Sequence, residues 1–305
     1  MRLISVLTFA LVCFMDPQHS QACDLEAPKI AEIMGVKPTT TTDGVVRVGW
    51  ARKDVAVEVD GLKMRPFMGL GTWAAFQQNG KMSMVMGDTV CFEDEVNPAM
   101  DAALKNGLEV TALHNHFFFD QPKVYFMHIG GSGCPNDLAK GVRAVWDAVK
   151  EVRKANPQPV RKFAGEAPTY GKLTTERLAE IVGTKGTRED DVFKITIGRT
   201  AEMGGVKFSG SMGLTTWMAF AGTDEAAVVG GDFAMTANEV QPVLKALRAA
   251  NINIVALHGH MVGETPTMYF THFWGKGKAE NLARGLQQAL KAQAEASKNA
   301  AANRK

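Results

Sequence analysis

The chain contains the same sequence unit twice, and this duplication constrains its fold more than any other feature. Residues 68–76 (MGLGTWAAF) return as residues 212–220 (MGLTTWMAF), with seven of nine positions identical and an offset of 144. The same offset relates Ala112–His114 to Ala256–His258 further along the chain. Self-similarity at one fixed spacing indicates a copied structural unit. The sequence therefore predicts two similar domains, each large enough to enclose a core.

The repeat and the composition together divide the 305 residues into segments. Residues 1–22 are predicted to be a signal peptide, because one basic residue precedes a short apolar run and a small-residue cleavage site. Repeat unit 1 is predicted to span residues 23–153 and repeat unit 2 residues 171–292. The proline-containing segment 154–170 is predicted to be a linker. Residues 293–305 lack an apolar face, so we expect a flexible tail there.

The hydrophobic pattern within each unit predicts an α+β fold. Alternating, strand-like runs occur at residues 55–59 and 193–197, and two further strands flank a turn in each unit. Helical spacing is found at 29–34, 95–105, 138–153, 175–182, 239–250 and 279–294, and the strand pairs are 109–116 with 123–129 and 253–260 with 267–273. We expect two tandem repeats of a similar mixed α/β unit, each with a β-hairpin that carries histidines.

Six of the seven histidines occupy equivalent positions in the two units. Each unit has a His-x-His pair and then a third histidine after eleven intervening residues. Residues two apart on a strand point to the same face, and a hairpin that closes symmetrically places the third histidine opposite the first. Three imidazoles then converge in each unit and can bind a metal ion. The candidate metal ligands are His114, His116 and His128 in unit 1 and His258, His260 and His272 in unit 2.

Imidazole ligands favour a divalent transition metal, and zinc is the first expectation. Met127, Met261 and Met268 lie close to the histidines in the sequence, so copper, which accepts thioether ligands, is the alternative. Three protein ligands would leave one coordination position open to water or substrate. The sequence leaves open whether one unit or both bind a metal. Hydrogen-bonded histidines without any metal are the simpler alternative.

Two acidic residues, Asp120 and Glu264, occupy equivalent positions in the predicted hairpin turns. We consider them candidate catalytic residues, because a carboxylate near a metal can orient a ligand imidazole or move a proton. The alternative is a solvated turn carboxylate. Tyr125 and Tyr269 also repeat, and their spacing from the third histidine predicts that they point to the opposite face, into the core.

The predicted signal peptide ends near Ala22, so we expect a periplasmic or secreted protein. Cys23 follows directly, but Gln21 is poorly suited to lipoprotein processing, so a lipoprotein is the less favoured alternative. No other segment reaches about 18 consecutive apolar residues, and no transmembrane segment is expected. A net charge of +2 gives no reason to expect a nucleic-acid partner. One disulfide and one free thiol can form among Cys23, Cys91 and Cys134, with the pairing open.

Four short segments of the chain are distinctive: residues 70–76 (LGTWAAF), 86–88 (MGD), 93–98 (EDEVNP) and 110–116 (VTALHNH). Through them the chain resembles the LppY/LpqO family, exported bacterial proteins that carry a domain of unknown function. The resemblance covers most of the mature chain, in two tandem copies, and implies export without a settled activity. A weaker resemblance to acetolactate decarboxylase rests on the histidine spacing, and implies that the six histidines are metal ligands.

These features predict an exported metal-binding protein. The first interpretation is a metal-dependent enzyme of the zinc type, with three histidine ligands and a small polar substrate. The alternative is a non-catalytic metal-binding or metal-carrier protein of the periplasm. A structural role, in which metal ions clamp the hairpins, is a third hypothesis. The expected partners are a metal ion and a small molecule, and the sequence does not decide whether the chain is an enzyme.

Overall fold

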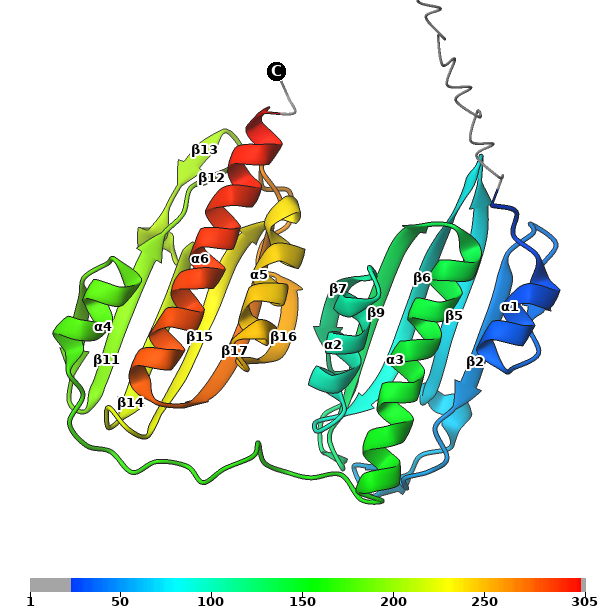
Figure 1. Ribbon diagram of the computed structural model, residues 1–305, viewed down its shortest axis with the longest axis horizontal. Coiled ribbons are helices and arrows are strands. Elements are labelled where there is room, and N and C mark those ends of the chain that lie inside the picture. Colours follow the sequence, from blue (N-terminus) through cyan, green and yellow to red (C-terminus); the bar gives the residue numbers. More distant parts are fainter. Residues whose placement is uncertain (1–22, 303–305) are drawn as a thin grey trace, which may run out of the picture.

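The computed structural model describes residues 23–302, so the predicted signal peptide lies outside the described residues. The elements of unit 1 recur in nearly the same order in unit 2 (Figure 1). Unit 1 contains α1 (Ala27–Met34), β1 (Thr39–Thr40), β2 (Val46–Ala51), β3 (Glu58–Val59), β4 (Leu62–Lys63), β5 (Gly71–Asn79), β6 (Met82–Phe92), α2 (Val96–Lys105), β7 (Glu109–His114), β8 (Asp120–Gln121), β9 (Val124–Gly133) and α3 (Pro135–Ala155). Unit 2 contains α4 (Thr175–Val182), β10 (Gly186–Glu189), β11 (Val192–Gly198), β12 (Ala201–Met203), β13 (Val206–Phe208), β14 (Thr215–Gly222), β15 (Ala227–Thr236), α5 (Ala237–Ala249), β16 (Asn253–Gly259), β17 (Met268–Gly277) and α6 (Ala279–Ala302).

The helices of both units lie on one face of the sheet (Figure 1). Helix α3 shows why this face is apolar. Val142, Val145 and Val149 recur at three- and four-residue steps and are buried in the main core, so one side of the helix packs inward. Tyr125 and Tyr269 also pack against this core, on the side that the spacing predicts. The predicted α+β fold with a repeated unit is confirmed.

The strands of both units form one sheet of twelve strands, in the order β1-β2-β5-β6-β9-β7-β16-β17-β15-β14-β11-β10. At its centre β7 pairs antiparallel with β16, and Leu113 lies opposite Leu257. These leucines occupy the same position of the repeat. A residue that pairs with its own equivalent lies beside a local twofold axis, so a half-turn relates the two units.

Two side-chain amides reinforce this central strand pair in a reciprocal way. Asn97 of α2 donates to the carbonyl of Ile254 (3.1 Å) and accepts from the N–H of Ile254 (2.9 Å). Gln241 of α5, its equivalent, donates to the carbonyl of Val110 (2.8 Å) and accepts from the N–H of Val110 (3.1 Å). Each amide thus satisfies the backbone of the other unit where a bulge interrupts the strand register.

Two small lobes project from the face opposite the helices. In unit 1 the lobe contains the sheet β4-β3-β8, and in unit 2 it contains the pair β12-β13. Each covers its own small core. The buried residues are Val55, Val57, Leu70, Val90, Phe92, Val124 and Phe126 in unit 1, and Ala201, Leu214, Ala234, Met268 and Phe270 in unit 2.

Two segments differ from their sequence-based predictions. Residues 55–59 are predicted to form a strand, but only Glu58–Val59 does so, because the alternating valines bury in the lobe core instead. Residues 293–305 are predicted to be a flexible tail, yet α6 continues to Ala302. Gln293 is buried and donates to the carbonyl of Ala234 (2.8 Å) and to Glu239 (2.9 Å), which holds this part of the helix on the sheet.

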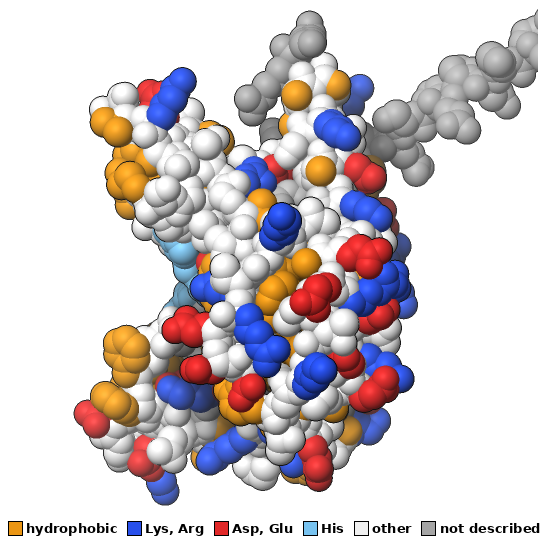
Figure 2. All heavy atoms as spheres, turned by 90° about the vertical axis from the view of Figure 1, so that its left-hand side faces the viewer, with side chains coloured by type: hydrophobic (Ala, Val, Ile, Leu, Met, Phe, Trp, Pro, Cys, Tyr) orange, Lys and Arg blue, Asp and Glu red, His pale blue; other side chains and the backbone are white. Residues whose placement is uncertain are grey.

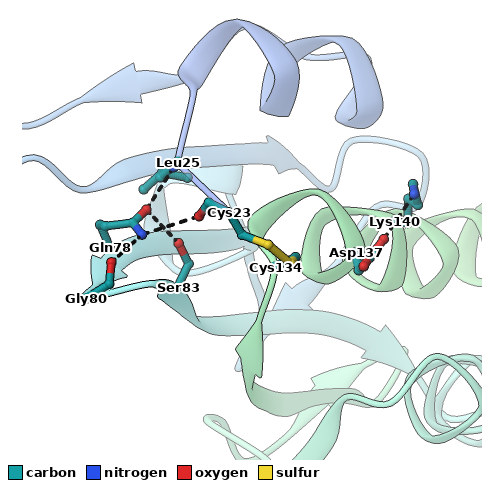
Figure 3. The surroundings of a disulfide bond; sticks show 8 residues. All are labelled: Cys23, Leu25, Gln78, Gly80, Ser83, Cys134, Asp137 and Lys140. Carbon is teal, nitrogen blue, oxygen red and sulfur yellow. Dashed lines mark hydrogen bonds and ion pairs between the residues drawn. A yellow bond between two sulfur atoms is a disulfide. The ribbon is translucent and has the colours of Figure 1, made fainter. Parts of the chain in front are cut away.

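A disulfide joins Cys23 to Cys134 and ties the start of the described chain to the start of α3 (Figure 3). Gln78 supports this connection, since its amide donates to the Cys23 carbonyl (3.3 Å) and accepts from the Leu25 N–H (2.8 Å). Cys91 is a buried free thiol, and burial raises its pKa. The structure thus has the one bridge and one free thiol that the sequence allows. Among residues 23–302 no helix combines the length and apolar character needed to cross a bilayer.

Asn97→Ala should lower the free energy of unfolding by about 2 kcal/mol, because the buried N–H and C=O of Ile254 both lose a partner. Urea denaturation measures this change. The matched control is Asn79→Ala at an exposed strand end, which should change stability by less than about 0.5 kcal/mol. Equal stability of the two variants would contradict the role of Asn97 at the centre of the sheet.

Candidate metal centre

In each unit an aspartate lies directly beside the third histidine of the predicted cluster. Asp88 on β6 is paired with His128 on β9, and Asp232 on β15 is paired with His272 on β17. Side chains that are directly opposite on antiparallel strands point to the same face and lie close together. The sheet register therefore places one carboxylate next to one imidazole in both units.

The pleat of β9 directs these side chains away from the helices. Met127 and Ile129 flank His128 and are buried in the main core beneath the helices. Because successive strand residues alternate between faces, His128 points to the opposite face. Figure 2 shows histidine side chains gathered on that face, at the bottom of a groove between two projecting parts of the molecule.

The strand register differs from the symmetric hairpin that the histidine spacing predicts. His128 lies opposite Ala112 rather than opposite His114, and unit 2 has the same shift. The cause is the turn: in unit 1 Asp120–Gln121 pair with β3 in the lobe, so the hairpin does not close symmetrically about Gln121. Since the shift is an even number of residues, it leaves every histidine on its predicted face.

All three imidazoles converge in unit 2, whereas in unit 1 His116 and His128 each lie beside His114. In unit 1, His128 Nε2 lies 3.0 Å from His114 Nε2, and the ring centroid of His114 lies 5.1 Å from those of both His116 and His128. In unit 2, one nitrogen from each ring lies within 4.8 Å of the other two; these residues are His258, His260 and His272. The spacing is close to that of nitrogens that share one cation at about 2.0 to 2.1 Å each.

Backbone carbonyls orient the first histidine of each cluster. His114 Nδ1 lies 3.2 Å from the carbonyl oxygen of Asn115, and His258 Nδ1 lies 3.1 Å from that of Gly259. A proton on Nδ1 that is donated to a carbonyl leaves Nε2 with its lone pair. This is the tautomer that a metal ligand requires.

The second histidine of each cluster is held by the lobe core. His116 stacks on Phe126 with ring centroids 3.3 Å apart, and His260 stacks on Phe270 at 3.4 Å. Both phenylalanines are buried in the lobes. Burial lowers the pKa of His116 and of His260, and the neighbouring histidines lower it further. These imidazoles are therefore favoured in the neutral form, which is the form that binds metals.

Asp88 and Asp232 are candidate site residues that the sequence analysis missed. These residues are only 7% and 3% exposed, and within the described chain Oδ1 of each has no hydrogen-bond partner. Burial raises the pKa of Asp88, and it raises the pKa of Asp232 to about 6, against the opposing effect of nearby histidines. Asp232 lies 4.0 Å from His260 Nε2 and 3.9 Å from His272 Nδ1. A cation between these groups would offset the cost of burying the carboxylate.

The donors present fit a divalent transition metal. Three imidazole nitrogens and one carboxylate oxygen make a set of four, which matches the tetrahedral coordination that zinc prefers. The sequence predicts three ligands and one open position for water or substrate. In the structure a buried aspartate is paired with the third histidine of each unit, and it is the nearest protein carboxylate that could add a fourth donor.

The predicted catalytic residues Asp120 and Glu264 are not brought to the histidines. Asp120 accepts a hydrogen bond from the Val124 N–H (2.7 Å), and Glu264 accepts one from the Met268 N–H (2.8 Å). Both side chains are buried, and among the described residues their hydrogen bonds lie within their own turns and involve no imidazole. Their contacts stabilise the two turns rather than support proton transfer at a metal.

Comparison with known proteins identifies the family. Residues 28–148 and 176–292 each match the family described as Domain of Unknown Function (DUF1259). The chain belongs to this family. Two matched segments confirm the prediction of two tandem copies of an uncharacterised domain. No curated protein matches the chain.

Comparison with solved structures also found matches, all with low TM-scores and low sequence identity. EtuB from Clostridium kluyveri is 13% identical, with 86% of this chain and 92% of that chain covered and a TM-score of 0.20. PduB, a trimeric bacterial microcompartment shell protein, is 12% identical over 84% of this chain and 89% of its own, with a TM-score of 0.22. MSM0271, a double ringed trimeric shell protein from the RMM microcompartment, is 10% identical over 70% of this chain and 82% of its own, with a TM-score of 0.20.

The predicted function requires a correction. The sequence predicts an exported metal-binding protein that is a zinc-type enzyme, or alternatively a periplasmic metal carrier. Two of the solved structures found are described as shell proteins, a description that differs from the predicted enzyme or carrier. The site also departs from the enzyme prediction, because the carboxylates of Asp120 and Glu264 accept hydrogen bonds within their turns. The enzyme and carrier interpretations are therefore not retained.

Glu264→Ala should lower the free energy of unfolding by about 1 to 3 kcal/mol, because the N–H of Met268 loses its acceptor in a buried turn. Chemical denaturation measures the change. Glu166→Ala, at an exposed position between the units, is the control and should stay within about 0.5 kcal/mol of the wild type. If Glu264→Ala were as stable as the control, the turn role assigned to Glu264 would be wrong.

Proposed function

We propose that each histidine cluster binds one divalent transition metal ion in a structural role, with zinc as the first expectation and copper as the alternative. The observation that carries this proposal is the buried aspartate beside the third histidine in each unit. Structural metal sites use four protein ligands, whereas catalytic sites keep one position for water or substrate. The proposed ligands are His114, His116, His128 and Asp88 in unit 1, and His258, His260, His272 and Asp232 in unit 2.

The origin of the four donors explains what a bound ion would do. In unit 1 they come from the strands β6, β7 and β9 and from the segment that leaves β7 toward the lobe. An ion held by them cross-links three strands and fixes the start of the lobe segment. Because these donors are far apart in the unfolded chain, the free energy of metal binding adds to the free energy of folding.

We also propose that the protein works outside the cytoplasm, as its predicted signal peptide and its resemblance to LppY/LpqO imply. The disulfide between Cys23 and Cys134 supports this, because disulfides persist in oxidising compartments. It also favours a soluble exported form over a lipoprotein, since the Cys23 sulfur is already bonded. The resemblance to acetolactate decarboxylase contributes only the spacing of the histidines.

The location can be tested by expressing the full chain in a bacterium with a periplasm. We expect the protein in the periplasmic fraction, with a mass that shows the loss of residues 1–22 and an intact Cys23–Cys134 bridge. Mass spectrometry with and without a reductant measures both. Full-length, reduced protein confined to the cytoplasm would contradict the proposed location.

Asp232→Asn should lower the bound metal from about two ions per chain to about one, because an amide is a poor replacement for a carboxylate ligand. His260→Ala should do the same. Elemental analysis after dialysis against dilute zinc measures the content. Glu264→Gln is the matched control, since this turn residue should leave both ions in place. Full metal content in Asp232→Asn and His260→Ala would contradict the proposed ligand set.

Removal of the metal should lower the melting temperature of the wild-type protein by about 5 °C or more, because an ion that binds only the folded state stabilises it. The comparison is between zinc-loaded protein and protein treated with a chelator. In the double variant Asp88→Asn/Asp232→Asn the two melting curves should nearly coincide. A wild-type melting temperature that does not respond to the chelator, although metal is lost, would refute the structural role.

A further inference from the structure

An open cleft of about 720 Å³ lies beside the histidine cluster of unit 1. Asp88 and His116 contribute to its lining, so the cleft adjoins the proposed metal site. Among the other lining residues, three are basic, three are aromatic and none is acidic. The basic residues are Arg47, Lys53 and Arg65, and the aromatic residues are Trp50, Phe67 and Trp73.

The three basic side chains of this cleft have no acidic partners. Among the ion pairs of residues 23–302, none involves Arg47, Lys53 or Arg65. The guanidinium of Arg47 lies over the ring of Trp73, 4.2 Å from its centroid, and is held there without an anion. Like charges in one concave surface repel each other, and a bound anion would offset that repulsion.

One part of this arrangement belongs to the duplicated scaffold. In unit 2, Lys194 lies over the ring of Trp217 at 4.4 Å, as Arg47 lies over Trp73 in unit 1. Both pairs come from neighbouring strands at the same position of the repeat. A cation on this tryptophan is therefore a general feature of the fold and does not by itself indicate a ligand.

The other charged and aromatic residues are specific to unit 1. Arg52 and Arg199 are equivalent, since each donates its N–H to the leucine before the next strand, and this fixes the alignment around the cleft. The correspondences are Lys53 with Thr200, Arg65 with Ser209 and Phe67 with Ser211. Because unit 2 folds with small uncharged residues at these positions, the fold does not require two cations and an exposed ring here.

We propose that the unit 1 cleft binds a small aromatic carboxylate. Lys53 and Arg65 supply charge-assisted hydrogen bonds to carboxylate oxygens, and Arg47 adds a third positive charge. The exposed ring of Phe67 offers a flat surface for a planar apolar group, and Trp73, with Arg47 over its ring, lines the cleft beside it. The volume falls in the range of about 300 to 1,000 Å³ found for small-molecule sites. These contacts need no metal ion.

The test is isothermal titration of the mature, disulfide-bonded protein with phthalate, after treatment with a chelator and again after loading with zinc. The neutral analogue phthalamide serves as the uncharged comparison. We expect saturable phthalate binding with a Kd of about 1 mM or tighter in both preparations. Arg65→Ser and Lys53→Thr, which copy the residues of unit 2, should each weaken it about tenfold.

Lys207→Thr, an exposed basic residue of the unit 2 lobe, is the control variant and should leave phthalate binding unchanged. Circular dichroism verifies that each variant is folded. The proposal is overturned if the wild type does not bind phthalate, if phthalamide binds equally well, or if both cleft variants bind like Lys207→Thr. Phthalate binding is measured on metal-free protein, so its absence would overturn only the cleft proposal. The proposed metal sites are tested separately, by the metal content of the protein.

Discussion

The antiparallel register of β6 with β9, and of β15 with β17, is the constraint on which the site depends. It places a buried aspartate directly beside the third histidine in both units. A slip of one residue would turn the histidine into the main core beneath the helices and expose its apolar neighbours. The same apolar contacts that bury Met127 and Ile129 under α3 therefore hold His128 and Asp88 on the groove face. The strand register that packs the core is therefore the same register that forms the site.

The twofold relation between the units brings both clusters onto one face of a continuous sheet. The central pairing of β7 with β16, supported by Asn97 and Gln241, joins the two halves through buried hydrogen bonds. Each lobe then holds one histidine by stacking it on a core phenylalanine. Where the units differ, as at Arg65 and Ser209, the difference falls outside this shared framework and marks the cleft of unit 1.

The sequence predicts the repeat, the α+β class and the convergence of the histidines, because periodicity and the alternation of a strand are local properties. It does not reveal Asp88 as a neighbour of His128, since these residues lie forty positions apart and meet only through strand pairing. Asp120 is nearer to the histidines in the chain but serves the turn. The end of α6 is predicted to be flexible because residues 293–305 lack an apolar face, and the sequence does not reveal that Gln293 contacts Ala234 on a distant strand.

The central claim is that three imidazoles and one buried carboxylate hold a metal ion in each unit. Anomalous diffraction from a zinc-loaded crystal, measured on both sides of the zinc absorption edge, tests it most directly. The account predicts one strong peak within each cluster, at about 2.0 to 2.2 Å from the three histidine nitrogens and one aspartate oxygen. Zinc-loaded crystals with no peak at either cluster, or with peaks whose ligands exclude the aspartates, would contradict it.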